Sequence, residues 1–251
     1  MLKVRVIPVL LLRDGRMVKP KQFGAGGERD VGYPATTARI YDSQNADELV
    51  FIDLSAGAGR AFLLDTLKEI AQQCFIPITA GGGIRSLDDV QEVLKSGADK
   101  VSINTEALRR PEFITEIAKR YGSQCVVVSI DVRKENGVYE VYCRGGAERA
   151  GWTAVAWAKE AAQRGAGELL LTSIDNEGMM GGYELALIKE VSAAVTIPVI
   201  AHGGSGNRQD FVDAVGAGSS AVAAASIFHF SDSNLSQVKS FMHNAGLPVR
   251  L

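Results

Sequence analysis

The stretch Ile76-Pro77-Ile78-Thr79-Ala80-Gly81-Gly82-Gly83 returns later in the chain as Ile197-Pro198-Val199-Ile200-Ala201-His202-Gly203-Gly204. The two stretches start at residues 76 and 197, and this offset of 121 is close to half of the 251-residue chain. Two further segments recur at nearly the same offset, 48–53 as 168–173 and 97–101 as 218–222. Three matches at one offset indicate two copies of one half-fold, and we expect the copies to span about residues 1–122 and 123–251.

The composition is that of a globular chain with a large apolar core. Hydrophobic residues make up 46% of it, and 29 acidic residues nearly cancel 27 basic ones, which gives no electrostatic basis for non-specific nucleic-acid binding. The N-terminus runs directly into a strand pattern, and no apolar run reaches the ~18 residues that cross a bilayer. We therefore predict a soluble cytoplasmic protein that binds neither nucleic acid nor membrane.

The three cysteines, Cys74, Cys125 and Cys143, are far apart in the sequence. They show none of the spacings that are typical of zinc ligands, so we predict no metal site. No motif in the chain indicates a bound cofactor either.

Short apolar runs alternate with longer amphipathic ones along the whole chain, which is typical of a parallel sheet with covering helices. At about 250 residues, eight such units fit one (β/α)8 barrel domain. A doubly wound open sheet is the main alternative, but two repeated (β/α)4 halves favour the closed barrel. The predicted strands are 4–11, 48–53, 76–80, 99–104, 125–131, 168–173, 197–202 and 220–225. The predicted helices are 34–44, 60–74, 87–96, 110–121, 153–164, 184–194, 208–216 and 233–245.

One stretch, from Pro20 to Tyr33, shows neither pattern and contains four glycines. Loops of this length in a compact domain are often functional lids. We therefore expect it to be a loop above the ends of the strands.

The two glycine turns are the strongest functional signal. Glycines allow backbone amides to converge on an anion, and a following helix start adds its positive end. Because the turns are paired by the repeat, we predict that Gly82, Gly83, Gly203 and Gly204 bind two phosphates. Asn104, Thr105 and Ser226 follow the neighbouring strands and are expected to complete the two sites, with Thr172 close by. A ligand with a phosphate at each end would then span the barrel mouth.

Asp131 is the strongest acid-base candidate, because it ends an otherwise apolar strand. A carboxylate at such a position can serve as a general acid or base. The position that the repeat pairs with it holds Leu11 and not an acid. A carboxylate in place of Leu11 is expected to be within reach of water, at modest cost to folding.

Four charged residues stand at the opposite ends of the predicted strands: Arg5, Glu48, Lys100 and Glu168. They are expected either to form mutual salt bridges that only stabilise the barrel, or to guard an entrance to its axis.

These motifs resemble the cyclase subunit of imidazole glycerol phosphate synthase over essentially the whole chain. The similar stretches include Asp14-Gly15-Arg16 with Lys19, Asp47-Glu48-Leu49-Val50-Phe51, Gly97-Ala98-Asp99-Lys100-Val101-Ser102-Ile103-Asn104-Thr105 and Leu171-Thr172-Ser173-Ile174-Asp175. The resemblance implies a half-barrel duplication with two phosphate sites, in which Lys19 also serves the phosphorylated substrate. It implies a glutaminase partner on the face of the strand starts, with Arg5, Glu48, Lys100 and Glu168 as a gate for ammonia.

The chain departs from the family pattern at three places. The family uses two catalytic aspartates, of which Asp131 matches the second, whereas Leu11 replaces the first. Losing one member of an acid-base pair typically costs a factor of ~10²–10⁴ in rate. Glu177 with Met179-Met180 alters the loop after the sixth strand, and Gly24–Gly27 forms an insertion over the site.

Two functions therefore remain open on the sequence. One is an ammonia-dependent lyase-cyclase, which the glycine turns, Lys19 and Asp131 favour. The other is an ammonia conduit without cyclase chemistry, which Leu11 favours. Such a paralogue would work with a glutaminase and a sugar-amidating enzyme in surface-polysaccharide biosynthesis.

Overall fold

The computed structural model describes residues 2–14, 16–24, 27–55 and 60–251 of the chain. Eight parallel strands close into a barrel in the order β10-β11-β12-β1-β4-β5-β6-β7, and β7 pairs with β10 to complete the ring. The barrel strands are β1 (Arg5–Arg13), β4 (Leu49–Asp53), β5 (Ile78–Gly81), β6 (Lys100–Ile103), β7 (Val126–Glu135), β10 (Glu168–Ser173), β11 (Val199–His202) and β12 (Ala221–Ala224). The predicted (β/α)8 barrel is confirmed.

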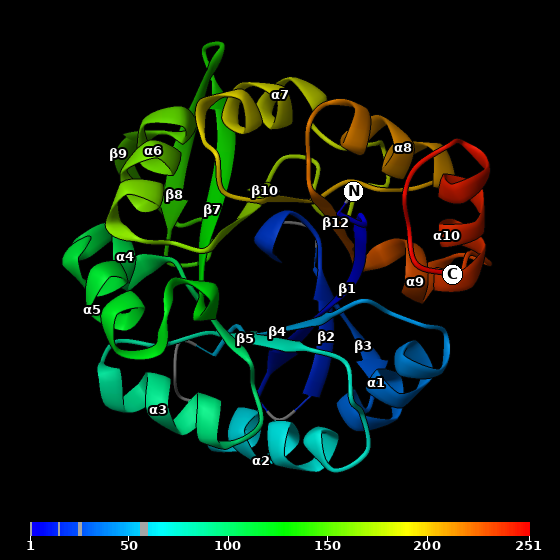
Figure 1. Cartoon of the computed structure of the whole chain (residues 1–251), viewed down its shortest axis with the longest axis horizontal. Helices are drawn as coiled ribbons and strands as arrows, with labels where there is room; N and C mark the ends of the chain where they lie inside the picture. Colours follow the sequence, from blue (N-terminus) through cyan, green and yellow to red (C-terminus); the bar gives the residue numbers. More distant parts are fainter. Residues whose placement is uncertain (1, 15, 25–26, 56–59) are drawn as a thin grey trace.

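The helices surround this ring, as Figure 1 shows in a view close to the barrel axis. Their bounds are α1 (Pro34–Ser43), α2 (Arg60–Ala71), α3 (Leu87–Lys95), α4 (Thr105–Arg109), α5 (Glu112–Tyr121), α6 (Ala154–Arg164), α7 (Leu185–Ala194), α8 (Arg208–Gly216), α9 (Ser226–Phe230) and α10 (Leu235–Asn244). Capping fixes the start of several helices. Ser86 accepts from the Asp89 amide at the start of α3, and Asn207 does the same for α8.

Successive side chains of a strand point to opposite faces of the sheet, so the apolar residues of the barrel strands form two cores. Residues that point outward pack against the helices, and among them are Phe51, Ile103 and Leu171. Residues that point inward fill the barrel, and among them are Ile7 and Val127. The strands are therefore apolar on both faces, which is why the sequence shows continuous apolar runs.

The stretch from Pro20 to Tyr33 was expected to be a loop, but it contains a strand and is part of an antiparallel β-ribbon. β2 (Arg16–Pro20) turns back against β1, and β3 (Glu28–Gly32) pairs antiparallel with β2. Of the insertion Gly24–Gly27, residues 25 and 26 lie outside the described ones. β3 is mostly exposed and carries Glu28, Arg29 and Asp30, so it has no apolar alternation that sequence reasoning could detect.

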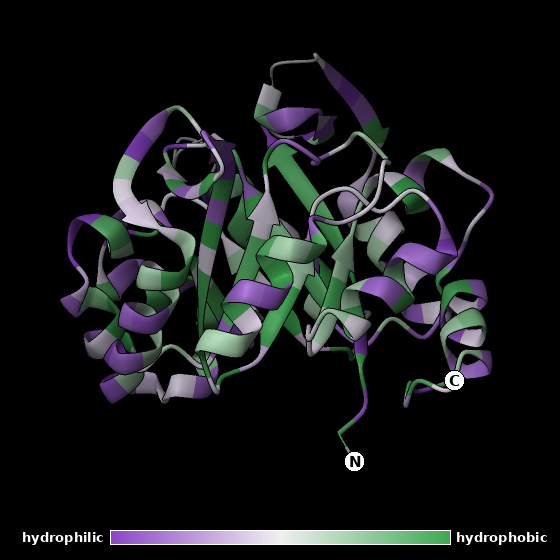
Figure 2. Ribbon diagram, turned by 90° about the horizontal axis from the view of Figure 1, so that it is seen from above, coloured by the Kyte–Doolittle hydropathy of each residue, from purple (hydrophilic) through white to green (hydrophobic). Residues whose placement is uncertain are grey.

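A second ribbon, β8 (Val138–Cys143) with β9 (Glu148–Thr153), continues β7 beyond the barrel. Both ribbons leave the C-terminal ends of the strands, and Figure 2 shows the N-terminus at the bottom of the barrel, opposite the strands that project above it. Within the described part of the chain, no helix is long and apolar enough to cross a lipid bilayer.

Candidate active site

Asp131 does not end its strand, as was expected, but lies in the middle of β7, where β7 leaves the barrel and begins to pair with β8. It points into the barrel, because Val127 and Ser129 of the same strand also face inward. Its carboxylate accepts hydrogen bonds from Ser129 Oγ at 3.0 Å and from Asn104 Nδ2 at 3.1 Å. Burial raises the pKa of Asp131 to about 7, and the Ser129 hydroxyl opposes that shift only in part. A carboxyl group with such a pKa can both give and take a proton at neutral pH.

Asn104 holds Asp131 more directly than the sequence suggested. Its amide group also donates to the backbone carbonyls of Ser129 and Tyr142, and its Oδ1 accepts from Thr105. The polar atoms of the Asn104 side chain are therefore bonded to other protein groups, and in the structure this side chain orients the Asp131 carboxylate.

The two glycine turns follow β5 and β11, as predicted. Gly82, Gly83, Gly203 and Gly204 all have positive φ, which side chains rarely adopt. A Cβ on Gly82 would lie 2.1 Å from the carbonyl oxygen of Asp53, so the turn requires glycine there. Among the described residues, the backbone amides of these four glycines have no acceptor. Unpaired amides that converge in this way can bind an anion.

The second turn opens into a small cavity of about 10 Å³, room for about one water molecule. It is lined by Glu177, Gly178, His202, Gly203, Gly204, Ser205, Ala224, Ala225 and Ser226. A phosphate group would enter only if a side chain such as Glu177 moved.

Lys19 and Glu177 form a buried ion pair beside this cavity. Lys19 Nζ also donates to the carbonyl of Pro20, whereas Glu177 Oε2 has no partner among the described residues. The pair connects β2 to the loop after β10, and a bond from the Gln22 amide to the Glu177 carbonyl supports this link. Lys19 thus lies near the second turn, and its charge is already matched by Glu177.

His202 is the site residue that the sequence analysis missed. It ends β11, points inward like Ile200, and its Nδ1 lies 3.2 Å from Thr172 Oγ1. Burial and the charge of Lys19 lower the pKa of His202 to about 3, so the imidazole is neutral at pH 7. The signal in the sequence was a histidine where the other copy of the repeat has Gly81.

The four charged residues at the strand starts form a closed ring across the opposite end of the barrel. Arg5 contacts Glu48 at 2.6 Å and Glu168 at 3.0 Å. Lys100 contacts the same two carboxylates at 3.0 Å and 3.2 Å. Thr79 Oγ1 also donates to Glu48, at 2.6 Å. The ring lies below the inward-facing apolar residues of the barrel.

Leu11 is in the interior, where the repeat pairs it with Asp131. It is only 8% exposed and packs in the apolar cluster inside the barrel, paired in register with Ile52 and Val18. A carboxylate at this position would therefore be buried against apolar groups. The expectation of easy access to water was wrong, because the β2–β3 ribbon covers this side of the barrel mouth.

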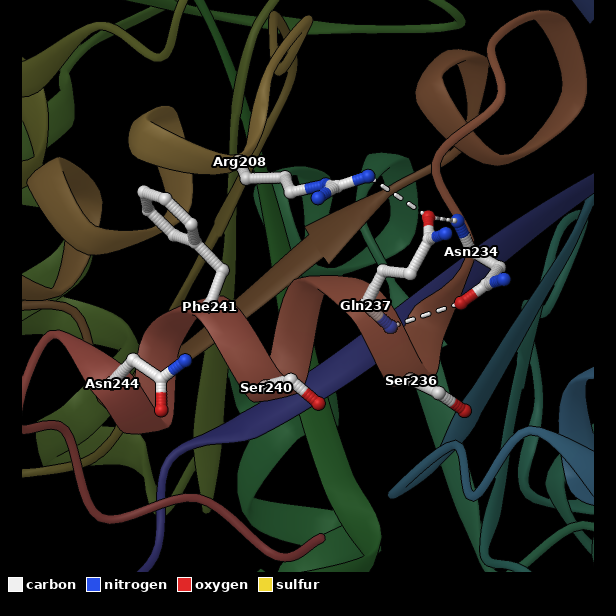
Figure 3. Close-up of a pocket in the computed structure, with 7 residues that line it drawn as sticks. All are labelled: Arg208, Asn234, Ser236, Gln237, Ser240, Phe241 and Asn244. Carbon is white, nitrogen blue, oxygen red and sulfur yellow. Dashed lines mark hydrogen bonds between the residues drawn. The ribbon is translucent and has the colours of Figure 1, made fainter.

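A larger hollow of about 370 Å³ lies on the outside of the barrel, between α8 and α10. Figure 3 shows Arg208 across it, donating to Gln237 at 2.9 Å. Its lining comes from helix surfaces and not from strand ends, so it is separate from the site described above.

The structure is a (β/α)8 barrel with an acidic side chain at its mouth, between two glycine turns. The family model "Histidine biosynthesis protein" matches residues 5–234 of the chain. The chain is 50% identical over 254 aligned positions to the imidazole glycerol phosphate synthase subunit HisF of Anoxybacillus flavithermus, with all of both chains covered. It is 49% identical to HisF of Streptomyces avermitilis, with 99% of each chain covered, and 48% identical to HisF of Hyphomonas neptunium, with 100% and 99% covered. The chain belongs to the HisF family of cyclase subunits of imidazole glycerol phosphate synthase.

Proposed function

We propose that the chain acts as the ammonia-dependent cyclase subunit of an imidazole glycerol phosphate synthase. Its ligand would carry a phosphate at each end and span the mouth from the turn at Gly82-Gly83 to the turn at Gly203-Gly204. The observation that carries the proposal is Asp131, buried between these turns with a pKa near neutrality. The resemblance in length and sequence to HisF subunits supports it.

In this proposal Asp131 transfers protons to and from the reacting part of the ligand. Ser129 and Asn104 hold its two oxygens in a fixed orientation, which places the proton at a defined point of the mouth. The unpaired amides of the glycine turns would bind the phosphates and align the ligand before reaction.

The partner in this proposal is a glutaminase that binds the face of the strand starts. The relatives are each named as a subunit, which supports an assembly of this kind. The ring of Arg5, Glu48, Lys100 and Glu168 lies on the barrel axis at this face and would gate the entry of ammonia. Phe75, which precedes β5 on the same face, is 90% exposed and offers an apolar side chain that a partner could bury.

We also propose that the chain consists of two half-barrels, about residues 1–122 and 123–251, each of which contributes one of the paired turns. The recurrence of sequence at offsets of 120 and 121 supports this division.

Leu11 is the specific observation that favours an ammonia conduit without cyclase chemistry. Only Asp131, of the two expected acids, is present in the barrel. The whole-length similarity to HisF subunits does not favour this alternative, and none of the relatives supports a sugar-amidating partner.

Turnover of the family's bisphosphate substrate by the purified chain with an ammonium salt tests the proposal. Turnover that Asp131→Asn abolishes would support it. A well-folded chain that binds the substrate without turning it over would favour the conduit. Adding a co-expressed glutaminase with glutamine then tests the partner, because the complex should replace the ammonium salt.

A further inference from the structure

The mouth of the barrel is polar along four adjacent strands and apolar along the other four. On or directly after β6, β7, β10 and β11, the inward-facing residues at the barrel mouth are Asn104, Asp131, Thr172 and His202. On β12, β1, β4 and β5 they are Ala225, Leu11, Ile52 and Gly81. Because these strands follow one another around the ring, each half of the mouth is continuous.

The glycine turns lie at different borders of these two halves. The first turn follows β5, the last strand of the apolar half, and the second follows β11, the last strand of the polar half. A ligand that spans both turns would therefore have Asp131 on one side and the apolar wall around Leu11 on the other.

His202 makes the two turns chemically different. In the repeat it takes the place of Gly81, where a Cβ would lie 2.6 Å from the Ser102 carbonyl oxygen. On the second turn the neighbouring strand carries Ala223 in the position of Ser102, and an imidazole is accommodated. Both turns contain two successive glycines with positive φ, but only the second has a side chain at this position, and that side chain lines a cavity.

The imidazole is held in place for contact with a ligand. Thr172 Oγ1 lies 3.2 Å from Nδ1, and the same Thr172 is in register with Asp131 on its other side. His202 is 9% exposed and lines the cavity together with Gly203 and Gly204. If the Thr172 hydroxyl donates to Nδ1, the ring proton is on Nε2, and Nε2 is then a donor.

We propose that His202 is a specificity-determining residue, whose Nε2–H donates to a ligand oxygen at the second turn and so fixes which end of the bisphosphate lies there. The inference rests on the proposed function for the identity of the ligand. A ligand bound in the reverse direction would present its other end to His202 and turn a different group toward Asp131. The direction of binding therefore decides which atoms reach the acid.

Binding measured by calorimetry separates this role from catalysis. The probes are the bisphosphate substrate and two monophosphate analogues, each of which keeps one end of it. We expect His202→Gly to weaken binding of the bisphosphate and of one analogue by about 10- to 100-fold, and to leave the other analogue unchanged. His202→Gln, which keeps a neutral donor, should recover most of the loss. His243→Gln, on the exposed surface of α10, is the matched control and should change nothing.

The protonation and tautomer of the His202 imidazole are tested separately, by ¹⁵N NMR of the histidines with and without inorganic phosphate. We expect His202 to stay neutral between pH 6 and 8 with its proton on Nε2. Equal losses for both analogues, no loss at all, failure of the Gln variant to recover binding, or a proton on Nδ1 would each overturn the proposal. The wild-type chain could bind the bisphosphate without turning it over, while His202→Gly weakens binding of the bisphosphate and of one analogue only. That result would support the role of His202 and refute the cyclase function alone. A wild-type chain that binds none of the probes would overturn both.

Discussion

Asp131→Asn is expected to abolish turnover and, at the same time, to stabilise the protein above neutral pH. The wild-type carboxyl has a pKa of about 7 in the folded state, against ~3.9 in an unfolded chain. Between these values the unfolded state has lost its proton and the folded state has kept it. Stability of the wild type therefore falls as pH rises through this window, by ~1.4 kcal/mol per unit and about 4 kcal/mol in all.

The asparagine removes this penalty, since it carries no charge to bury. It cannot accept from both Ser129 and Asn104, because one of its polar groups is now a donor, and losing one such bond costs about 1 kcal/mol. We therefore expect the variant to be less stable than the wild type at pH 4, and about 1–3 kcal/mol more stable at pH 8.

Urea denaturation at both pH values checks this, with the fluorescence of the buried Trp157 as the signal. Asp65→Asn is the control, because Asp65 is exposed on α2 and should change stability by less than about 0.5 kcal/mol at either pH. If Asp131→Asn is destabilised equally at pH 4 and pH 8, the claim that burial raises the pKa of Asp131 is refuted.

The remaining predictions concern the apolar side of the mouth, the first turn and the partner face. Leu11→Asp should cost about 2–5 kcal/mol of folding stability, because it places a carboxyl in an apolar cluster, and any gain in ammonia-dependent turnover over Leu11→Asn would identify that carboxyl as the missing acid. Gly82→Ala should cost about 1–3 kcal/mol and weaken phosphate binding, whereas Gly216→Ala, with open space around it, should be neutral or slightly stabilising in the same urea titration. Phe75→Ala should leave turnover with free ammonia unchanged but weaken the complex with the glutaminase at least tenfold in a titration; unchanged affinity would remove Phe75 from the interface.

The barrel was predictable because its strands are buried on both faces and therefore apolar throughout. The strand at 168–173 has the predicted bounds, and the others differ by a few residues at their ends. The ring of Arg5, Glu48, Lys100 and Glu168 was also predictable. Side chains alternate between the two faces of a strand, and charged residues that point inward at the strand starts meet on the barrel axis. The antiparallel ribbons were not predictable, because β3 and β9 are edge strands with exposed residues on both faces.

The positions of Asp131 and of the glycine turns at the barrel mouth could be predicted, but the contacts of the other side chains could not. The roles of Asn104 and Lys19 depend on which partner each side chain contacts, and the sequence cannot give these contacts. His202 was overlooked because its role depends on the groups around it. The sequence does not show whether a histidine is neutral or which group its ring contacts. Those surroundings come from Thr172 and Lys19, which are distant from it in the sequence.

The closed ring at the strand starts makes its four members depend on one another. Each carboxylate is shared by two cations and each cation by two carboxylates, so the ring is electrically neutral as a whole. Removing Arg5 alone leaves two carboxylates to compete for Lys100, whereas removing Arg5 together with Glu48 leaves the Lys100–Glu168 pair intact. Substitutions here are therefore strongly non-additive, and a change in one member favours a compensating change in its neighbour. The floor of the barrel is therefore better able to tolerate the loss of an oppositely charged pair than the loss of one member.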